Sequence, residues 1–314
     1  MRVLLTGADG FAGGWLARHL LAAGHHVAGT HRPEARHSPV LESSEMDRIE
    51  WRALELGSRE SIEHAARGPW DVVFHLAAVS SGGEARADPG LAWGVNAAGT
   101  ARLAESLAEQ RRGGSDPLLL LISSGEVYGL GQGRPRQETD PVAPCSPYAA
   151  SKAGAEIAVQ EVALRTGLRV MVARAFPHTG PGQDHRFVIP ALAGRLVAAK
   201  QIRAPAIKAG TLEAVRDFLD VRDATRGYLQ LAERGKAGTV YNVASGEGRT
   251  LESVAERLMA LVEWTVTIET DARLVRQSDI KHLVGDPTRL RELGWSPTVS
   301  FDQTLRDLLD AQAH

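Results

Sequence analysis

The chain has 314 residues, of which 43% are hydrophobic and 24% are charged, and its formal net charge is −2. A chain of this length can form one large core, or one core with a smaller lobe, and its near-neutral charge gives no reason to expect nucleic acid or a membrane as a partner. Cys145 is the single cysteine, which excludes an internal disulfide and favours a reducing compartment. The apolar run before Gly7 is too short for a signal peptide, and no stretch reaches the ~20 apolar residues that span a bilayer. We therefore expect a cytoplasmic protein.

Short apolar runs alternate with helix-length segments through the first half. Residues 118–122 are all Leu or Ile, and the other runs also lack polar alternation, which predicts strands that are buried on both faces. Such strands, covered by helices, make an α/β fold with a Rossmann-type doubly wound parallel sheet. The predicted strands are 3–6, 26–30, 49–54, 71–76, 117–123 and 168–174, and the predicted helices are 11–23, 91–110 and 146–166.

The pattern changes after about residue 175, where turn-rich segments separate the predicted helices 186–200, 250–262 and 301–312. This part does not show the pattern of an independent core. We predict a dinucleotide-binding domain over 1–175, completed by returns from the second half. Residues 176–314 are predicted to form a smaller substrate-binding lobe over the carboxyl ends of the strands.

A glycine motif, G-A-D-G-F-A-G at residues 7–13, follows the first strand and opens the first helix. Glycines at these places allow a tight turn, a close approach of backbone N–H groups to a pyrophosphate, and close packing of helix on strand. The spacing alone is a weak signal, but its place between the first strand and first helix predicts cofactor binding. The candidate residues are Gly7, Asp9, Gly10, Phe11 and Gly13.

The second strand ends in Gly29-Thr30-His31-Arg32 and has no acidic residue for a ribose 2′-hydroxyl. We therefore favour NADP(H), with Arg32 on the 2′-phosphate. Arg32 could instead be a solvated loop residue, and Glu34 could turn inward, which would fit NAD(H).

Tyr148 and Lys152 are four residues apart in a helical pattern, so they share one helix face. A nearby ammonium group favours the phenolate, which predicts a lowered pKa for Tyr148 and a proton-transfer role. The fifth strand ends in Ser123 and Ser124, and a hydroxyl there can bind a substrate carbonyl. Ser124 is the first choice and Ser123 the alternative.

With these pieces, the sequence resembles the extended short-chain dehydrogenase/reductase family over nearly the whole chain. His75-Leu76-Ala77-Ala78 is similar to the end of the family's fourth strand, which contacts the cofactor. Residues 95–100, V-N-A-A-G-T, are similar to the family's VNxxGT segment, in which Asn96 supports the sheet and the active site. The resemblance adds Leu76, Ala77, Ala78, Asn96, Tyr148, Lys152 and His178 to the cofactor-binding residues.

The second half resembles the GDP-sugar branch of this family. Residues 174–183 are similar to its R-x-F-N-H-T-G-P-x-Q stretch, and residues 210–223, 241–246 and 276–279 match in the same order. The similarity is greatest to GDP-4-keto-6-deoxy-D-mannose reductases, which make GDP-D-rhamnose, and weaker to GDP-mannose 4,6-dehydratases. The substrate contacts that this implies are Arg216 and Arg276 on phosphate, Asp279 on ribose, Phe187 and Val188 near the base and phosphates, and Ser80.

Simpler interpretations stay open for three of these residues. Arg216 could form a structural salt bridge with Asp217, and Arg276 and Asp279 could be a surface ion pair. Two positions depart from the branch pattern, because Pro177 replaces its Asn and Gln277 replaces its Pro. Pro177 has no side-chain donor, so it puts the nucleotide or sugar identity in doubt.

The expected reaction is NADPH-dependent reduction of the C4 keto group of a nucleotide-bound 4-keto-6-deoxyhexose, with a GDP-sugar favoured. A 4,6-dehydratase needs an extra acid/base beside the serine; Gly125 cannot supply it, whereas Glu126 could, so Glu126 does not decide. A dehydratase, a C4-epimerase and a non-catalytic cofactor sensor are the alternatives. The histidines show no metal-ligand spacing, and related proteins suggest a homodimer through the helices at 91–110 and 146–166.

Overall fold

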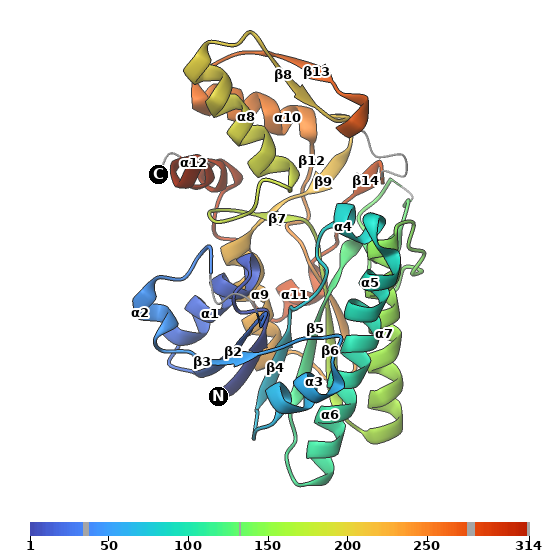
Figure 1. Ribbon diagram of the computed structural model, residues 1–314. Coiled ribbons are helices and arrows are strands. Elements are labelled where there is room, and N and C mark those ends of the chain that lie inside the picture. Colours follow the sequence, from blue (N-terminus) through green and yellow to red (C-terminus); the bar gives the residue numbers. More distant parts are fainter. Residues whose placement is uncertain (34–37, 132, 275–279, 313–314) are drawn as a thin grey trace.

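The computed structural model describes residues 1–33, 38–131, 133–274 and 280–312 (Figure 1). Seven strands form one sheet in the order β11-β6-β5-β4-β1-β2-β3, and every neighbouring pair is parallel. The strand order reverses between β1 and β4, which in open parallel sheets is the place where ligands bind. The strands are β1 Arg2–Thr6, β2 His26–His31, β3 Glu50–Ala53, β4 Val72–His75, β5 Leu118–Ser124, β6 Arg169–Ala175 and β11 Val240–Val243.

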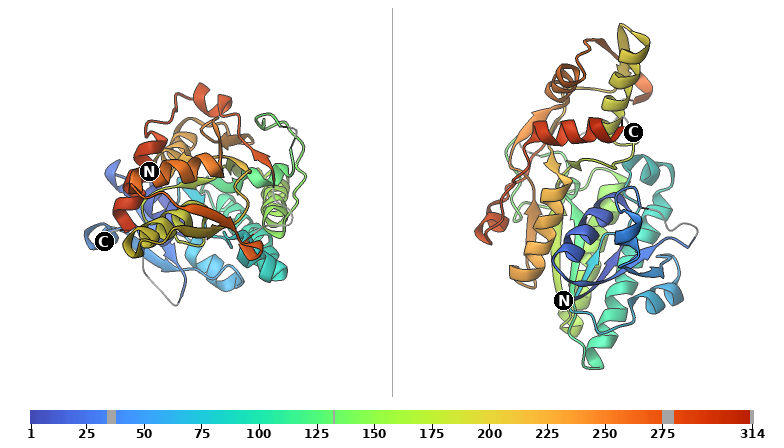
Figure 2. Two further views of the ribbon diagram at one scale, coloured as in Figure 1. Left: turned by 90° about the horizontal axis from the view of Figure 1, so that it is seen from above. Right: turned by 90° about the vertical axis from the view of Figure 1, so that its left-hand side faces the viewer.

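Helices cover both faces of this sheet, as Figures 1 and 2 show. On one face, the core joins the sheet to α1 (Phe11–Ala22), α9 (Val221–Arg234) and α11 (Thr288–Glu292). The other face packs against α3 (Arg59–Ala66), α6 (Thr100–Arg112) and α7 (Pro147–Thr166). The predicted Rossmann-type doubly wound α/β fold is therefore confirmed.

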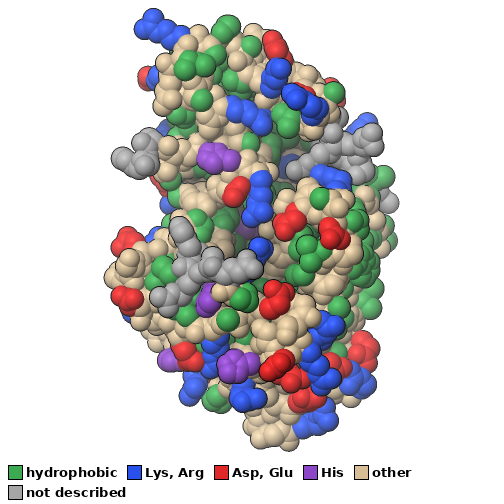
Figure 3. All heavy atoms as spheres, in the orientation of Figure 1, with side chains coloured by type: hydrophobic (Ala, Val, Ile, Leu, Met, Phe, Trp, Pro, Cys, Tyr) green, Lys and Arg blue, Asp and Glu red, His purple; other side chains and the backbone are tan. Residues whose placement is uncertain are grey.

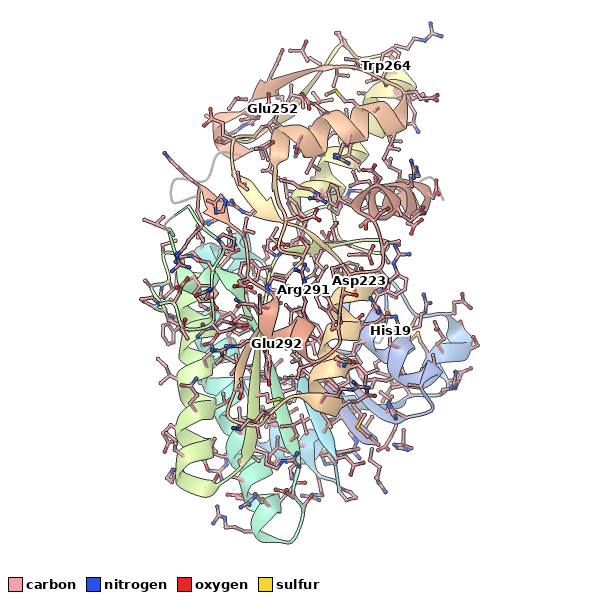
Figure 4. The ribbon with its side chains drawn as sticks, turned by 180° about the vertical axis from the view of Figure 1, so that it is seen from behind. His19, Asp223, Glu252, Trp264, Arg291 and Glu292 are labelled. Atoms are coloured by element: carbon pink, nitrogen blue, oxygen red, sulfur yellow. The ribbon has the colours of Figure 1, made fainter. Side chains whose placement is uncertain are left out.

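Residues from the second half of the chain complete the sheet. β11 adds an edge strand beside β6, and α9 packs on α1, where Thr225 hydrogen-bonds His19 at 3.1 Å. Figure 4 shows His19 beside the first turn of α9, which carries Asp223. The division at residue 175 stays a prediction, although these contacts locate the returns from the second half.

The predicted helix 91–110 is present, but it is not a uniform α-helix. α5 (Pro89–Trp93) runs into a π-helical stretch, η1 (Gly94–Gly99), and then into α6. A π-helical stretch accommodates an extra residue in a helix and is frequent at functional sites. Here it contains Asn96.

The C-terminal lobe has a core of its own, which corrects the expectation of no independent core. Phe218, Phe301 and residues of three helices are buried together in it. The helices predicted at 186–200, 250–262 and 301–312 are α8 Val188–Ile202, α10 Leu251–Val262 and α12 Phe301–Gln312. Short strands complete the lobe: β7 His178–Thr179, β8 Ala206–Ala209, β9 Val215–Asp217, β10 Leu219–Asp220, β12 Gly248–Thr250, β13 Thr267–Thr270 and β14 His282–Leu283.

The remaining elements are α2 Ser43–Met46, α4 Gly82–Ala87, η2 Gly125–Tyr128 and η3 Ala272–Leu274. Within the described ranges, no helix has the length and apolar character needed to cross a membrane.

Candidate active site

The glycine loop has a backbone shape that only glycine allows at two positions. Gly7 has φ +73°, in the left-handed region, and its N–H donates to Thr30 Oγ1 at 3.0 Å. A Cβ at Gly13 would overlap the carbonyl oxygen of Gly7, whereas one at Gly10 would meet only that oxygen, at 3.3 Å. α1 begins after Gly10 without a side-chain cap, so the N–H groups of its first turn are available to an anion. This cradle fits the pyrophosphate of a dinucleotide.

The carboxylate of Asp9, from the glycine loop, lies beside the end of β2, although β2 itself ends without an acidic residue. Its carboxylate accepts a hydrogen bond of 3.2 Å from the backbone N–H of Arg32, so it lies beside the end of β2. Burial raises the pKa of Asp9, although that hydrogen bond opposes the rise. The Arg32 side chain is exposed at this edge, and Glu34 lies outside the described residues.

A buried hydrogen-bond chain runs under the carboxyl ends of β1 and β4. Thr6 Oγ1 is 2.7 Å from His75 Nδ1, and His75 Nε2 is 2.9 Å from Thr100 Oγ1. Thr100 donates its proton to the carbonyl oxygen of Asn96, so His75 must donate from Nε2 and accept at Nδ1. Burial, reinforced by Lys152, lowers the pKa of His75 to about 3. The ring is therefore a neutral structural group, and the half-buried residues Leu76, Ala77 and Ala78 follow it.

Asn96 links two segments of the predicted site. Its side chain pairs with both the N–H and the carbonyl of Val79, at 2.8 and 3.0 Å, and donates to Ser151 Oγ at 2.9 Å. Ser151 in turn donates to the carbonyl of Tyr148. Asn96 therefore fixes α7 against the loop after β4, and its amide is fully used in doing so. Ser80, the next residue after Val79, is exposed.

The first turns of α7 carry Tyr148 and Lys152, the two residues that the sequence predicts for proton transfer. Ser146 caps the helix by accepting the N–H of Ala149 at 3.1 Å, and Pro147 occupies the first turn. Lys152 is buried, and its Nζ donates to the carbonyl of Ile122 in β5 at 2.5 Å. Burial lowers the pKa of Lys152 to about 8.

The expected lowering of the Tyr148 pKa is wrong for this structure. Burial raises that pKa, Glu126 raises it further, and a hydrogen bond with Ser124 only partly offsets the rise. The physical reason is that the Lys152 ammonium faces the Ile122 carbonyl, and desolvation outweighs its attraction for a phenolate. The Tyr148 phenol is therefore a weaker acid in this structure than a solvent-exposed tyrosine.

The two serines at the end of β5 point to different partners. Ser123 donates to Glu156 at 2.5 Å, and Glu156 forms a buried ion pair with Arg174 at 2.8 Å. Ser124 instead hydrogen-bonds Tyr148, and its Oγ accepts the backbone N–H of Glu126 at 3.1 Å. The structure thus groups Ser124, Tyr148 and Glu126, and it uses Ser123 in the ion-pair network.

His178 connects the lobe to the glycine loop. Its ring stacks on Phe11 with the centroids 6.2 Å apart and the planes 12° apart, and its Nδ1 donates to the carbonyl of Phe176 at 3.1 Å. Burial lowers its pKa, so the ring is neutral.

The predicted substrate residues lie on the lobe. Phe187 and Val188, both half-buried, are the cap and first residue of α8. Arg216 lies in β9, and its Nη1 donates to the carbonyl of Ile280 at 2.5 Å. Arg276 and Asp279 are outside the described residues, as is Gln277.

Among the residues that the structure describes, no group of three or more His, Cys, Asp or Glu side chains could hold a metal ion.

A family model described as GDP-mannose 4,6 dehydratase matches residues 4–308. The chain belongs to this family. The resemblance to extended short-chain dehydrogenase/reductases of the GDP-sugar branch is thus confirmed, and so is the expectation of an NAD(P)-dependent enzyme.

Family relatives differ in the reaction that their names describe. The chain is 33% identical to the GDP-6-deoxy-D-mannose reductase of Pseudomonas aeruginosa, over 98% of this chain and 96% of the relative. It is 30% identical to the UDP-glucose 4-epimerase of Mycolicibacterium smegmatis, over 96% and 95%. A solved structure of RMD from P. aeruginosa complexed with NADPH has a TM-score of 0.84 and 32% identity, and covers 99% of this chain and 98% of that one.

The sequence reasoning missed the buried ion pair of Glu156 and Arg174, which binds Ser123 next to the predicted site. Glu156 follows Lys152 by one further helix turn, so its spacing from Tyr148 and Lys152 was a usable signal. Arg174 pairs with it from β6, 18 residues away, and its guanidinium also lies 4.7 Å from the ring centroid of Tyr128. No local sequence pattern predicts this pairing of Glu156 with Arg174.

Proposed function

We propose that this enzyme reduces the C4 keto group of a nucleotide-bound 4-keto-6-deoxyhexose with NADPH, converting GDP-4-keto-6-deoxy-D-mannose to GDP-D-rhamnose. The observation that carries the proposal is the hydrogen bond between Ser124, at the end of β5, and the phenol of Tyr148, in the first turn of α7. Reduction of a ketone needs a proton donor, and a protonated phenol beside a serine hydroxyl supplies one. The relation to a GDP-6-deoxy-D-mannose reductase favours the substrate.

The residues of the site can divide the reaction between them. When bound, the reduced nicotinamide supplies a hydride to the carbonyl carbon. Ser124 and Tyr148 donate hydrogen bonds to the carbonyl oxygen, and Tyr148 passes its proton to that oxygen as negative charge develops there. The Lys152 ammonium lies on the same helix face and stabilises the phenolate that remains. Asn96 and Ser151 keep α7 in place during the transfer.

The cofactor residues follow from the cradle. Gly7, Gly10 and the first turn of α1 would hold the pyrophosphate, and Phe11 and His178 would lie toward the nicotinamide end. Arg32 would bind the 2′-phosphate, which favours NADP(H). Asp9, beside Arg32, could bind a ribose hydroxyl, so NAD(H) is the alternative that the cofactor comparison must test.

The competing reactions begin with the opposite proton transfer. A 4,6-dehydratase or a C4-epimerase first oxidises its sugar, so its tyrosine must accept a proton. A dehydratase also needs an extra acid/base, and Gly125 offers no carboxylate for it. Glu126 could supply one, because its charge already acts on Tyr148. A dehydratase is therefore the second candidate.

We also propose a homodimer through α5 and α7. Ile157 and Leu164 on α7 are 68% and 89% exposed, and Trp93 on α5 is also exposed. Figure 3 shows hydrophobic side chains along the edge that α5 and α7 form in Figure 1. Light scattering that gives one monomer mass would contradict this. The cytoplasmic location stays a prediction.

The reductase is tested by nicotinamide absorbance with GDP-4-keto-6-deoxymannose and either NADPH or NADH. Stoichiometric oxidation that disappears in Tyr148→Phe supports it, and the ratio of the two rates, repeated for Arg32→Ala, tests the cofactor preference. No oxidation contradicts this substrate. Incubation with GDP-mannose or UDP-glucose then tests the dehydratase and the epimerase, and cofactor binding without turnover of any of these substrates would point to a sensor.

A further inference from the structure

A second arginine lies directly beside Arg216. The three-stranded sheet β12-β9-β14 lies between the helices of the lobe and the large sheet (Figure 1). β9 and β12 are antiparallel, and Arg249 is the direct partner of Arg216 in their register. Directly opposed residues project from the same face with their Cβ atoms about 5 Å apart, and like charges in this arrangement destabilise a sheet. Glu247 offsets part of that repulsion by pairing with Arg249 at 2.6 Å, and a bound anion would offset more of it.

A buried carboxylate fixes this register. Asp217 has no exposed surface and accepts the N–H groups of Ser245 at 2.8 Å, Gly246 at 2.9 Å and Gly285 at 3.2 Å. These bonds tie the turn before β12 and the end of β14 to β9. The two arginines are therefore opposed by a rigid framework, on the face away from Asp217.

The Arg249 guanidinium is held in place with donors to spare. Its Cζ lies 4.7 Å from the ring centroid of Phe301, and its Nη2 donates to Glu247 at 2.6 Å. Its Nε is buried and has no hydrogen-bond partner among the described residues. Its side chain is only 21% exposed, so it does not move freely in solvent. Phe301 also stacks on Phe218, so Arg249 lies over a pair of stacked aromatic rings.

We propose that Arg249 is a further guanidinium for the diphosphate of the nucleotide sugar, in addition to those that the resemblance implies, and that it acts together with Arg216. The inference rests on the proposed function and on the phosphate-binding role that the family resemblance implies for Arg216. Two planar guanidinium groups on one face can each bind a phosphate in a bidentate manner, which a single lysine could not do. Nucleotides with two phosphates should therefore be preferred to those with one.

Calorimetric titration with GDP, GMP, UDP and NADPH tests this. Arg249→Met keeps an apolar stem over Phe301 and removes the charge, and Arg249→Gln keeps polarity. Arg257→Gln is the matched control, because Arg257 pairs with Asp302 in the same lobe and its loss changes the net charge equally. We expect both Arg249 variants to weaken GDP binding on the order of tenfold, GMP binding less, and NADPH binding not at all.

Three results overturn the inference. The first is wild-type GDP affinity in both Arg249 variants while Arg216→Gln loses it. The second is an equal loss for GDP, GMP and NADPH together with a lower melting temperature, which would mark Arg249 as a structural residue. The third is a wild-type protein that binds neither GDP nor UDP, and this one also removes the proposed function. Binding of UDP alone would retain the role of Arg249 and change the base.

Discussion

The region around α7 and the region around β9 handle charge in opposite ways. Around α7, Lys152, Glu156 and Arg174 are all buried, and each has a hydrogen-bond partner at a fixed distance. Around β9, Arg216 and Arg249 are half-buried and opposed across two strands. The first arrangement suits a proton transfer that must occur in one geometry, and the second suits capture of an anion from solvent. Substitutions should therefore change kcat in the first region and affinity in the second.

The largest separation should come from Tyr148→Phe. Removing the proton donor is expected to lower kcat by about 10²–10⁴-fold. GDP affinity should stay as in the wild type, because the proposed role of the phenol is at the sugar carbonyl and GDP carries no sugar at that position. Steady-state kinetics and calorimetry on one preparation measure both. A kcat within tenfold of the wild type would break the assignment of Tyr148.

The two neighbouring serines offer a matched pair. Ser124→Ala should lower kcat by about 10²-fold, the usual effect of losing one donor to a developing oxyanion. Ser123→Ala should leave kcat within a factor of about two and lower the free energy of unfolding by roughly 1.5–3 kcal/mol, because a buried carboxylate loses a hydrogen bond. Denaturant unfolding and initial rates distinguish them. The reverse pattern would exchange their roles.

The glycine loop, built from backbone, should behave unlike either charged region. Gly13→Ala places a Cβ on the Gly7 carbonyl and should lower the free energy of unfolding by about 1–3 kcal/mol without any cofactor. Gly10→Ala meets only one atom, so its unfolding should be unchanged while NADPH affinity falls tenfold or more. Equal NADPH affinity in Gly10→Ala and the wild type would place the pyrophosphate elsewhere.

The pKa of Lys152 makes activity and stability respond to pH with opposite signs. As pH rises through about 8 the ammonium is lost, so kcat/KM should fall about tenfold per pH unit. The unfolded chain, with an ordinary lysine pKa of 10.5, binds more protons between pH 8 and 10.5, so the contribution of Lys152 to the free energy of unfolding rises there. Denaturant unfolding of the wild type and of Lys152→Met, at several pH values and without cofactor, tests the prediction on stability. The same change of the unfolding free energy with pH in both proteins would contradict it.

The smallest effect should be that of salt. Raising ionic strength screens half-exposed arginines more than a buried group, so KM for the nucleotide sugar should rise a few-fold while kcat stays constant. Initial rates at two salt concentrations measure this. A change in kcat alone would indicate that the two regions do not divide the work as proposed.

The sheet was predictable because its strands are continuous apolar runs, as residues 118–122 show. Helix α9 was not predicted, although Val221, Ala224, Tyr228 and Leu231 are buried at helical spacing and could have shown it. β11 is different, because its place beside β6 depends on pairing between strands more than 60 positions apart. Sequence periodicity carries no information about such a partner.

The same distinction holds within the site. The four-residue spacing of Tyr148 and Lys152 is local, so their shared helix face followed from the sequence. Their pKa values did not follow, because burial dominates both shifts, with Glu126 and Ser124 acting on Tyr148 and Glu156 acting on Lys152. The choice between Ser123 and Ser124 likewise depended on Glu156, which binds Ser123 from α7. The acid beside Arg32 is Asp9, which comes from the glycine loop and not from β2.

The π-helical stretch at Gly94–Gly99 makes the position of Asn96 sensitive to the deletion of one residue. Each residue in an α-helix turns the chain by about 100°, and a π-turn holds one residue more than an α-turn. Deleting one residue here would restore a regular α-helix and rotate one flank against the other. α6 is anchored in the core by Leu103 and Leu107, so Asn96 and α5 would have to turn away from Val79 and Ser151. An in-frame deletion of one codon could therefore remove the support that Asn96 gives to α7, while every side chain proposed to touch the substrate is retained.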